Sequence, residues 1–75
     1  MTDKEVGELW QDLQRTKAAD IRGELYAEAL IGLIRQLVEE RREKYAAESD
    51  GKWDSLHYTA EVLDDFGIPE EGWLK

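Results

Sequence analysis

The segment LYAEALIGLIRQLVEERREKY, residues 25–45, decides the fold, because it is the most apolar stretch of the chain. On a helical wheel, at about 100° per residue, its apolar side chains form two rows about 90° apart. The first row holds Tyr26, Leu30, Leu33 and Leu37, and the second row holds Ala27, Ile31, Ile34 and Val38. Together the rows span roughly 160°, whereas an ordinary one-sided helix has an apolar stripe of about 100°. The sequence therefore predicts a helix that needs apolar partners on two sides.

This long helix is predicted over residues 21–48. The side opposite the two rows carries charged residues such as Glu28 and Arg35, and the helix is almost wholly charged beyond Val38. Asp50 and Gly51 are residue types that stop a helix and start a turn. At about 1.5 Å per residue the helix is about 40 Å long, which is unusual in so small a domain.

A shorter helix is predicted before it, over residues 3–16. Thr2 and Glu5 have the spacing of a capping box, in which each side chain bonds the other's backbone N–H. Val6, Leu9, Trp10 and Leu13 then recur on one helical face. We expect a break between residues 16 and 20, with Asp20 as the N-cap of the long helix. The short connection makes the two helices antiparallel neighbours.

A third helix is predicted over residues 55–66, capped by Asp54 or Ser55. Gly67 has the position of a C-terminal cap, and Pro69 prevents the helix from continuing. Residues 67–75 form a tail, and Trp10 and Phe66 are expected in the core. No segment has the alternating pattern of a strand. The sequence thus predicts an all-α fold, a helical hairpin plus a short third helix, in a single domain over residues 1–75.

The length of the chain suggests that it does not act alone. A domain of 75 residues buries only about 60% of its unfolded surface, so a monomer has little stability to spare. There is no Cys and only one His, so disulfides and a structural zinc are not expected. We predict that the two shorter helices cover one row and that the other row packs against the same helix of a second copy in a homodimer. The eight residues of the two rows are the candidate interface, and Gly23, Ala27 and Gly32 would allow close approach. A monomeric three-helix bundle and a complex with a different protein remain the alternatives.

The charge of the chain excludes some partners. It carries 18 acidic and 10 basic residues, for a net charge of −8, and such a surface repels nucleic acid and anionic membranes. Residues 39–75 hold 11 of the acidic residues and five of the basic ones. The N-terminus does not look like a secretion signal and no segment looks like a membrane span. A cytoplasmic protein with a protein partner is expected, with no direct binding of nucleic acid or membrane.

Acidic pairs in two helices offer a possible metal site. Glu39, Glu40 and Glu43 form one E-E-x-x-E pattern, and Glu61 and Asp64 form an E-x-x-D pattern. This spacing resembles that of the all-α nucleoside-triphosphate pyrophosphohydrolases, and the resemblance implies that these five carboxylates hold Mg²⁺. The resemblance covers these five residues alone, and here the second helix stops soon after Asp64. A magnesium-dependent enzyme is therefore the third hypothesis.

The first hypothesis is a small, acidic, non-catalytic protein-interaction module with no cofactor or metal. One form of it is a phage or mobile-element inhibitor whose acidic surface imitates DNA and binds a host enzyme. The second hypothesis is a structural or accessory subunit of a larger complex. Acidic and aromatic residues in the C-terminal half are the predicted partner surface. They are Glu43, Asp50, Trp53, Tyr58, Glu61, Asp64, Asp65 and Trp73.

Overall fold

The computed structural model describes residues 1–19 and 24–73, and these residues are helical except in the turns between helices. The helices are α1 (Asp3–Ala19), α2 (Glu24–Glu48), α3 (Ser55–Phe66) and α4 (Glu70–Trp73). The predicted all-α class is confirmed, and α3 begins and ends where the sequence pattern places it. Helix α1 continues three residues beyond the predicted end at residue 16. The predicted cap at Asp20 and start at residue 21 lie outside the described residues, and so does Gly23.

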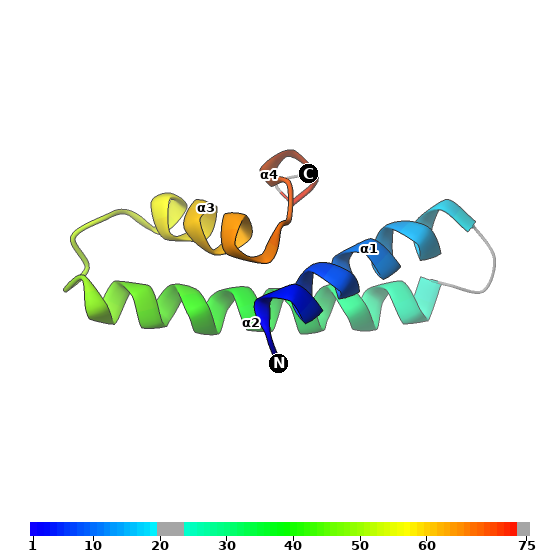
Figure 1. The fold of residues 1–75 in the computed structure, drawn as a ribbon, viewed down its shortest axis with the longest axis horizontal. Helices are drawn as coiled ribbons and strands as arrows, with labels where there is room; N and C mark the ends of the chain where they lie inside the picture. Colours follow the sequence, from blue (N-terminus) through cyan, green and yellow to red (C-terminus); the bar gives the residue numbers. More distant parts are fainter. Residues whose placement is uncertain (20–23, 74–75) are drawn as a thin grey trace.

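The long helix α2 forms the base of the molecule, and α1 and α3 lie one after the other along it (Figure 1). The molecule is accordingly elongated, with extents of 44 × 24 × 18 Å. The N-terminal part of α1 meets the C-terminal end of α3 near the middle of α2. Gly7 is needed at this junction, because a Cβ on it would lie 2.6 Å from the carbonyl oxygen of Phe66. Two short helices thus share the length of one long helix.

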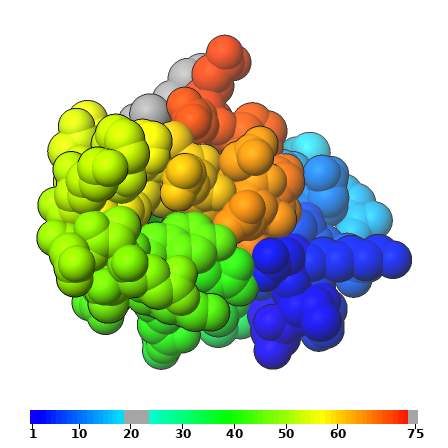
Figure 2. Space-filling view, turned by 60° about the vertical axis from the view of Figure 1, so that its left-hand side comes forward, coloured from blue at the N-terminus to red at the C-terminus, as the bar shows by residue number. Residues whose placement is uncertain are grey.

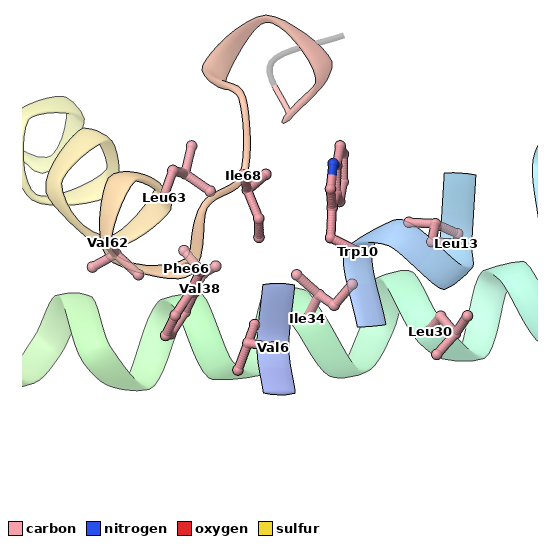
Figure 3. Packing of buried hydrophobic residues seen from close by; sticks show 10 residues of the cluster. All are labelled: Val6, Trp10, Leu13, Leu30, Ile34, Val38, Val62, Leu63, Phe66 and Ile68. Atoms are coloured by element: carbon pink, nitrogen blue, oxygen red, sulfur yellow. The ribbon is translucent and has the colours of Figure 1, made fainter. Parts of the chain in front are cut away.

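The core is one continuous cluster on the side of α2 that α1 and α3 cover (Figure 3). Helix α2 contributes Leu30, Ile34 and Val38, which are spaced four residues apart and form a stripe along the helix. Each fully buried aliphatic side chain contributes about 1.5–3 kcal/mol. The remaining buried apolar residues are Val6, Trp10 and Leu13 from α1, Tyr58, Val62, Leu63 and Phe66 from α3, and Ile68 after it.

The buried stripe corrects the expectation that one row is covered and the other is free. It runs between the two rows, since Leu30 belongs to the first row and Ile34 and Val38 belong to the second. Those three side chains lie inside the chain's own core and cannot also contact a partner in this arrangement. Ala27, Ile31 and Leu37 are half-buried against the core. Of the eight predicted interface residues, Tyr26 and Leu33 are exposed.

The helix ends follow the residue types that the sequence places there. The capping box of α1 is formed, because the N–H of Glu5 donates to Thr2 Oγ1 at 3.2 Å and the N–H of Thr2 donates to Glu5 Oε1 at 3.3 Å. Asp54 caps α3 by accepting from the N–H of His57 at 2.8 Å. Gly67 ends α3 in the left-handed conformation, at φ 73°. Beyond Gly67, α4 is a helical turn in the segment that was predicted as a tail. It brings the ring of Trp73 close to that of Trp10, with the ring centroids 6.2 Å apart.

Candidate functional site

An uncharged surface runs along the side of α2 that faces away from α1 and α3. It consists of Leu25, Tyr26, Ala29, Gly32, Leu33 and Gln36, all of them exposed, and we call it the α2 outer face. Leu25 is 80% exposed, Tyr26 47% and Leu33 39%. A Cβ added to Gly32 would meet no atom within 4 Å, so the middle of this face is open. Charged residues make up 37% of the chain, yet this exposed helix face carries none. The packing of the core on the other side of α2 does not require this face to be uncharged.

Charged residues lie along one edge of the α2 outer face. Glu28 and Arg35 are both exposed and are two helical turns apart on the same edge. Within the described residues neither of them forms an ion pair. On the other edge, the hydroxyl of Tyr26 donates to Asp12 Oδ2 of α1 at 2.7 Å. This hydrogen bond, with the negative charge of Asp12, raises the pKa of the Tyr26 hydroxyl.

A second apolar surface lies in the turn between α2 and α3. Trp53 is 50% exposed and Leu56 is 69% exposed. The Trp53 ring stacks on the His57 ring, with centroids 4.6 Å apart, and the Lys52 ammonium lies 5.4 Å from the Trp53 ring centroid. We call Lys52, Trp53, Leu56 and His57 the Trp53 platform. His57 Nε2 also lies 3.4 Å from Glu61 Oε1, so a carboxylate adjoins the stack.

Tyr58 was predicted on the partner surface, and the structure corrects this, because Tyr58 is buried with 4% exposure. Its hydroxyl accepts the backbone N–H of Trp53 at 3.0 Å and forms a second hydrogen bond with Ser49 Oγ. Ser49 Oγ in turn donates to the carbonyl of Tyr45 at 2.9 Å. Tyr58 therefore fixes the turn that carries Trp53, and its role is to position the platform.

Arg41 joins three helices, and the sequence analysis missed it. Its guanidinium donates to Asp3 of α1 at 2.7 Å, lies 3.8 Å from Asp65 of α3, and is 5.1 Å from the Phe66 ring centroid. The Arg41 hydrogen bond lowers the pKa of Asp3. Tyr45 donates to Asp65, and this hydrogen bond raises the pKa of Tyr45. Asp65, predicted as partner surface, is thus engaged within the chain.

The sequence did contain a signal for Arg41. It lies four residues beyond Leu37 and three beyond Val38, and this spacing places it beside the core on the helical wheel.

A small cavity adjoins this cluster. Its volume is about 270 Å³, and its wall combines apolar residues of the core with the basic side chains of Arg41 and Lys44. The complete lining is Met1, Val6, Leu37, Glu40, Arg41, Lys44 and Phe66. Because the strongest donor in the wall, Arg41, already binds Asp3 and contacts Asp65, the cavity offers a ligand little free hydrogen-bonding capacity.

The five carboxylates of the magnesium hypothesis do not converge. Glu39, Glu40, Glu43, Glu61 and Asp64 are all exposed. Across residues 1–19 and 24–73, no three side chains of the Asp, Glu, His or Cys types come close enough to hold a metal ion. Glu61 instead faces His57 on its own helix. Of the other residues predicted as partner surface, Asp50 is exposed and Trp73 is half-buried.

Among the helices that the structure describes, none is long and apolar enough to cross a membrane. Comparisons of the chain with protein-family models, with curated protein sequences and with solved structures find no match. The functional argument therefore rests on the geometry of the chain itself, which is that of an acidic all-α protein with two exposed apolar surfaces.

Proposed function

We propose that this protein is a non-catalytic protein-interaction module that pairs with a second copy of itself through the α2 outer face. The observation that carries the proposal is the absence of charge on this exposed face. Exposed apolar surface of this kind is typical of association sites. The two forms of this function that the sequence leaves open are an inhibitor of a host enzyme and an accessory subunit. Both require a surface that stays available after the chain has folded.

A second copy fits this face by symmetry, and charges of opposite sign meet near its centre. Most homodimers have a two-fold axis, so both copies use the same surface and every contact between two different residues occurs twice. In an antiparallel pair of α2 helices centred between residues 31 and 32, Glu28 of one copy lies opposite Arg35 of the other, and this ion pair occurs twice. Gly32 lies beside the centre, where the lack of a side chain lets the helix backbones approach. The proposed interface therefore shares only Tyr26 and Leu33 with the eight residues predicted from the sequence.

The test is the mass of the protein in solution, measured by light scattering. We expect the wild-type chain to have twice the 8.7 kDa mass of one chain at about 100 μM, a concentration that detects micromolar association. Leu33→Glu places a charge on the outer face and should yield the mass of one chain. The matched control is Ala47→Glu, which adds the same charge to an exposed position in the charged half of α2 and should leave the dimer intact.

Salt provides an independent check on this proposal. Each copy has a net charge of −8, so two copies repel each other, and salt screens that repulsion. Salt also weakens the two Glu28–Arg35 pairs, but exposed ion pairs contribute little, so self-association should strengthen as salt is added. A wild-type protein with the mass of one chain at every salt concentration would overturn the proposal, and so would a Leu33→Glu variant that keeps the mass of two chains.

A further inference from the structure

We infer that the Trp53 platform is a docking site for an arginine-bearing segment of a partner protein. The platform forms one end of the molecule, at the turn between α2 and α3 (the yellow-green surface in Figure 2). The inference rests on the proposed function, because it gives the interaction module the chemistry of its partner. It concerns a surface at a different end of α2 from the uncharged outer face, so the two can be tested separately.

The position of Trp53 is fixed before any partner arrives. Its backbone N–H is held by the buried Tyr58 hydroxyl at 3.0 Å, and its indole ring is stacked on His57. The next residue, Asp54, caps α3. An exposed aromatic side chain that is already ordered loses little entropy on binding, and this is a property of strong interface anchors.

The indole ring already contacts a cation. The Lys52 ammonium lies 5.4 Å from the Trp53 ring centroid, within the distance at which a cation is attracted to an aromatic face. A planar guanidinium stacks on an indole better than an ammonium does, because it is flat and more weakly hydrated. An arginine from a partner can therefore replace Lys52 at the ring.

The charges around the platform favour the same partner. Residues 48–61 contain four acidic residues, Glu48, Asp50, Asp54 and Glu61, and one basic residue, Lys52. Glu48, Asp50 and Glu61 are exposed. Carboxylates bind a guanidinium through two parallel hydrogen bonds, which an ammonium cannot form. The exposed Leu56 adds apolar surface for the remainder of the segment. An aromatic ring, a leucine and surrounding carboxylates together match a segment that combines arginine with apolar residues.

The probe is a blocked pentapeptide of alternating glycine and arginine, titrated into the Leu33→Glu variant and followed by NMR. Monomeric protein removes any contribution from self-association. We expect shifts in the Trp53 indole N–H and in the amides of residues 50–61. Trp53→Leu keeps apolar bulk but removes the aromatic face, and it should weaken binding about two- to five-fold, the range of an exposed cation–π contact.

Lys52 supplies the sharpest variant, because the inference predicts a gain. Lys52→Gln frees the ring and removes a competing cation, so peptide affinity should rise about two-fold or more. Lys17→Gln makes the same charge change at an exposed position of α1 and should raise affinity less. Replacing the arginines of the peptide by lysines should weaken binding, and added salt should weaken it further.

Three results would overturn the inference. One is that Trp53→Leu, added to the Leu33→Glu variant, leaves the affinity for the peptide unchanged. Another is an equal gain from Lys52→Gln and Lys17→Gln, because that would mean attraction by net charge alone. The third is a set of shifts spread over the acidic residues of α1 and α4 as well. None of these results affects the mass measurement. The dimer proposal can therefore hold if peptide binding at the Trp53 platform fails, and the platform can be tested even if the wild-type protein is monomeric.

Discussion

The half of α2 under α1 and the half under α3 share one buried side but have opposite outer sides. Leu30, Ile34 and Val38 run along the buried side of both halves. The outer side of the first half is the uncharged α2 outer face, whereas the outer side of the second half carries Glu39, Glu40 and Glu43, all exposed. The helix needs its buried side in order to fold, and neither outer side is needed for that. The proposed dimer accounts for the difference between the outer sides, because it uses the uncharged one as its contact surface.

The largest expected effect on stability comes from a substitution on the buried side of the first half of α2. Ile34→Ala empties a site with 0% exposure and should cost about 2–5 kcal/mol of unfolding free energy. A chain of this length has about 4–11 kcal/mol in total, so the variant should lose a large part of its stability. Urea denaturation monitored by circular dichroism measures this loss.

The matched substitution is Leu33→Ala, one residue away on the outer side. Because Leu33 is 39% exposed, its loss should cost less than about 1 kcal/mol in a single chain. In a dimer the cost should grow with protein concentration, since association stabilises the folded state by mass action. Equal costs for Ile34→Ala and Leu33→Ala at every concentration would contradict the division of α2 into two sides.

Two glycines sharpen the comparison with an intermediate effect. Gly7→Ala introduces a Cβ 2.6 Å from the Phe66 carbonyl oxygen, where α1 meets α3, and should destabilise the fold by about 1–3 kcal/mol. Gly32→Ala adds the same group to the open outer side and should stabilise the single chain by about 1 kcal/mol through helix propensity. Both are measured by urea denaturation in the Leu33→Glu background, so that self-association does not contribute. Stabilisation by Gly7→Ala as well as by Gly32→Ala would show that the junction is not closely packed.

A smaller effect is expected in the turn that follows the charged half. Tyr58→Phe removes the hydroxyl that accepts the Trp53 N–H and bonds Ser49, and should cost about 1 kcal/mol. For a domain of this size that is a fall of about 4–8 °C in Tm. The control is Tyr26→Phe, because the hydrogen bond from the Tyr26 hydroxyl to Asp12 is exposed to solvent and its loss should matter less. The Trp53 platform should also lose order in Tyr58→Phe, which broadened indole NMR signals would report.

Local sequence patterns were enough to predict the three main helices and the caps at Thr2, Asp54 and Gly67. The capping box at Thr2 and Glu5 and the Gly67 stop depend on side chains within a few residues, and such signals are visible without a structure. The burial of Trp10 and Phe66 followed from their places on amphipathic faces. The fold class could thus be predicted because each local preference agrees with the final packing.

The distribution of burial around α2 could not be predicted in the same way. The wheel shows a wide apolar sector, but which part of it is covered depends on where α1 and α3 lie along the helix. That placement is set at the Gly7–Phe66 contact, between residues far apart in the chain. The same applies to Tyr58, whose buried hydroxyl is satisfied by the turn before it, and to Arg41, which bonds a residue 38 positions away. Long-range contacts therefore account for the errors in the predicted surfaces.

The smallest expected effect tests the Arg41 cluster at the junction of the two halves. The hydrogen bond from Arg41 lowers the pKa of Asp3 below the ordinary value of an aspartate side chain. A carboxylate with a depressed folded pKa stabilises the protein above its unfolded pKa, and this contribution is lost as the pH falls through the folded value. Asp3→Asn should therefore be slightly less stable than wild type at pH 7, with a gap that closes as the pH falls below about 4. Thermal unfolding across this range measures the gap. The control is Asp64→Asn, because Asp64 is an exposed carboxylate that forms no ion pair within the described residues.

A difference in stability that stays constant with pH would show that Arg41 binds Asp3 without using its charge. In that case the junction between α1 and α3 would depend on the packing of Gly7 against Phe66 rather than on the charge of Arg41.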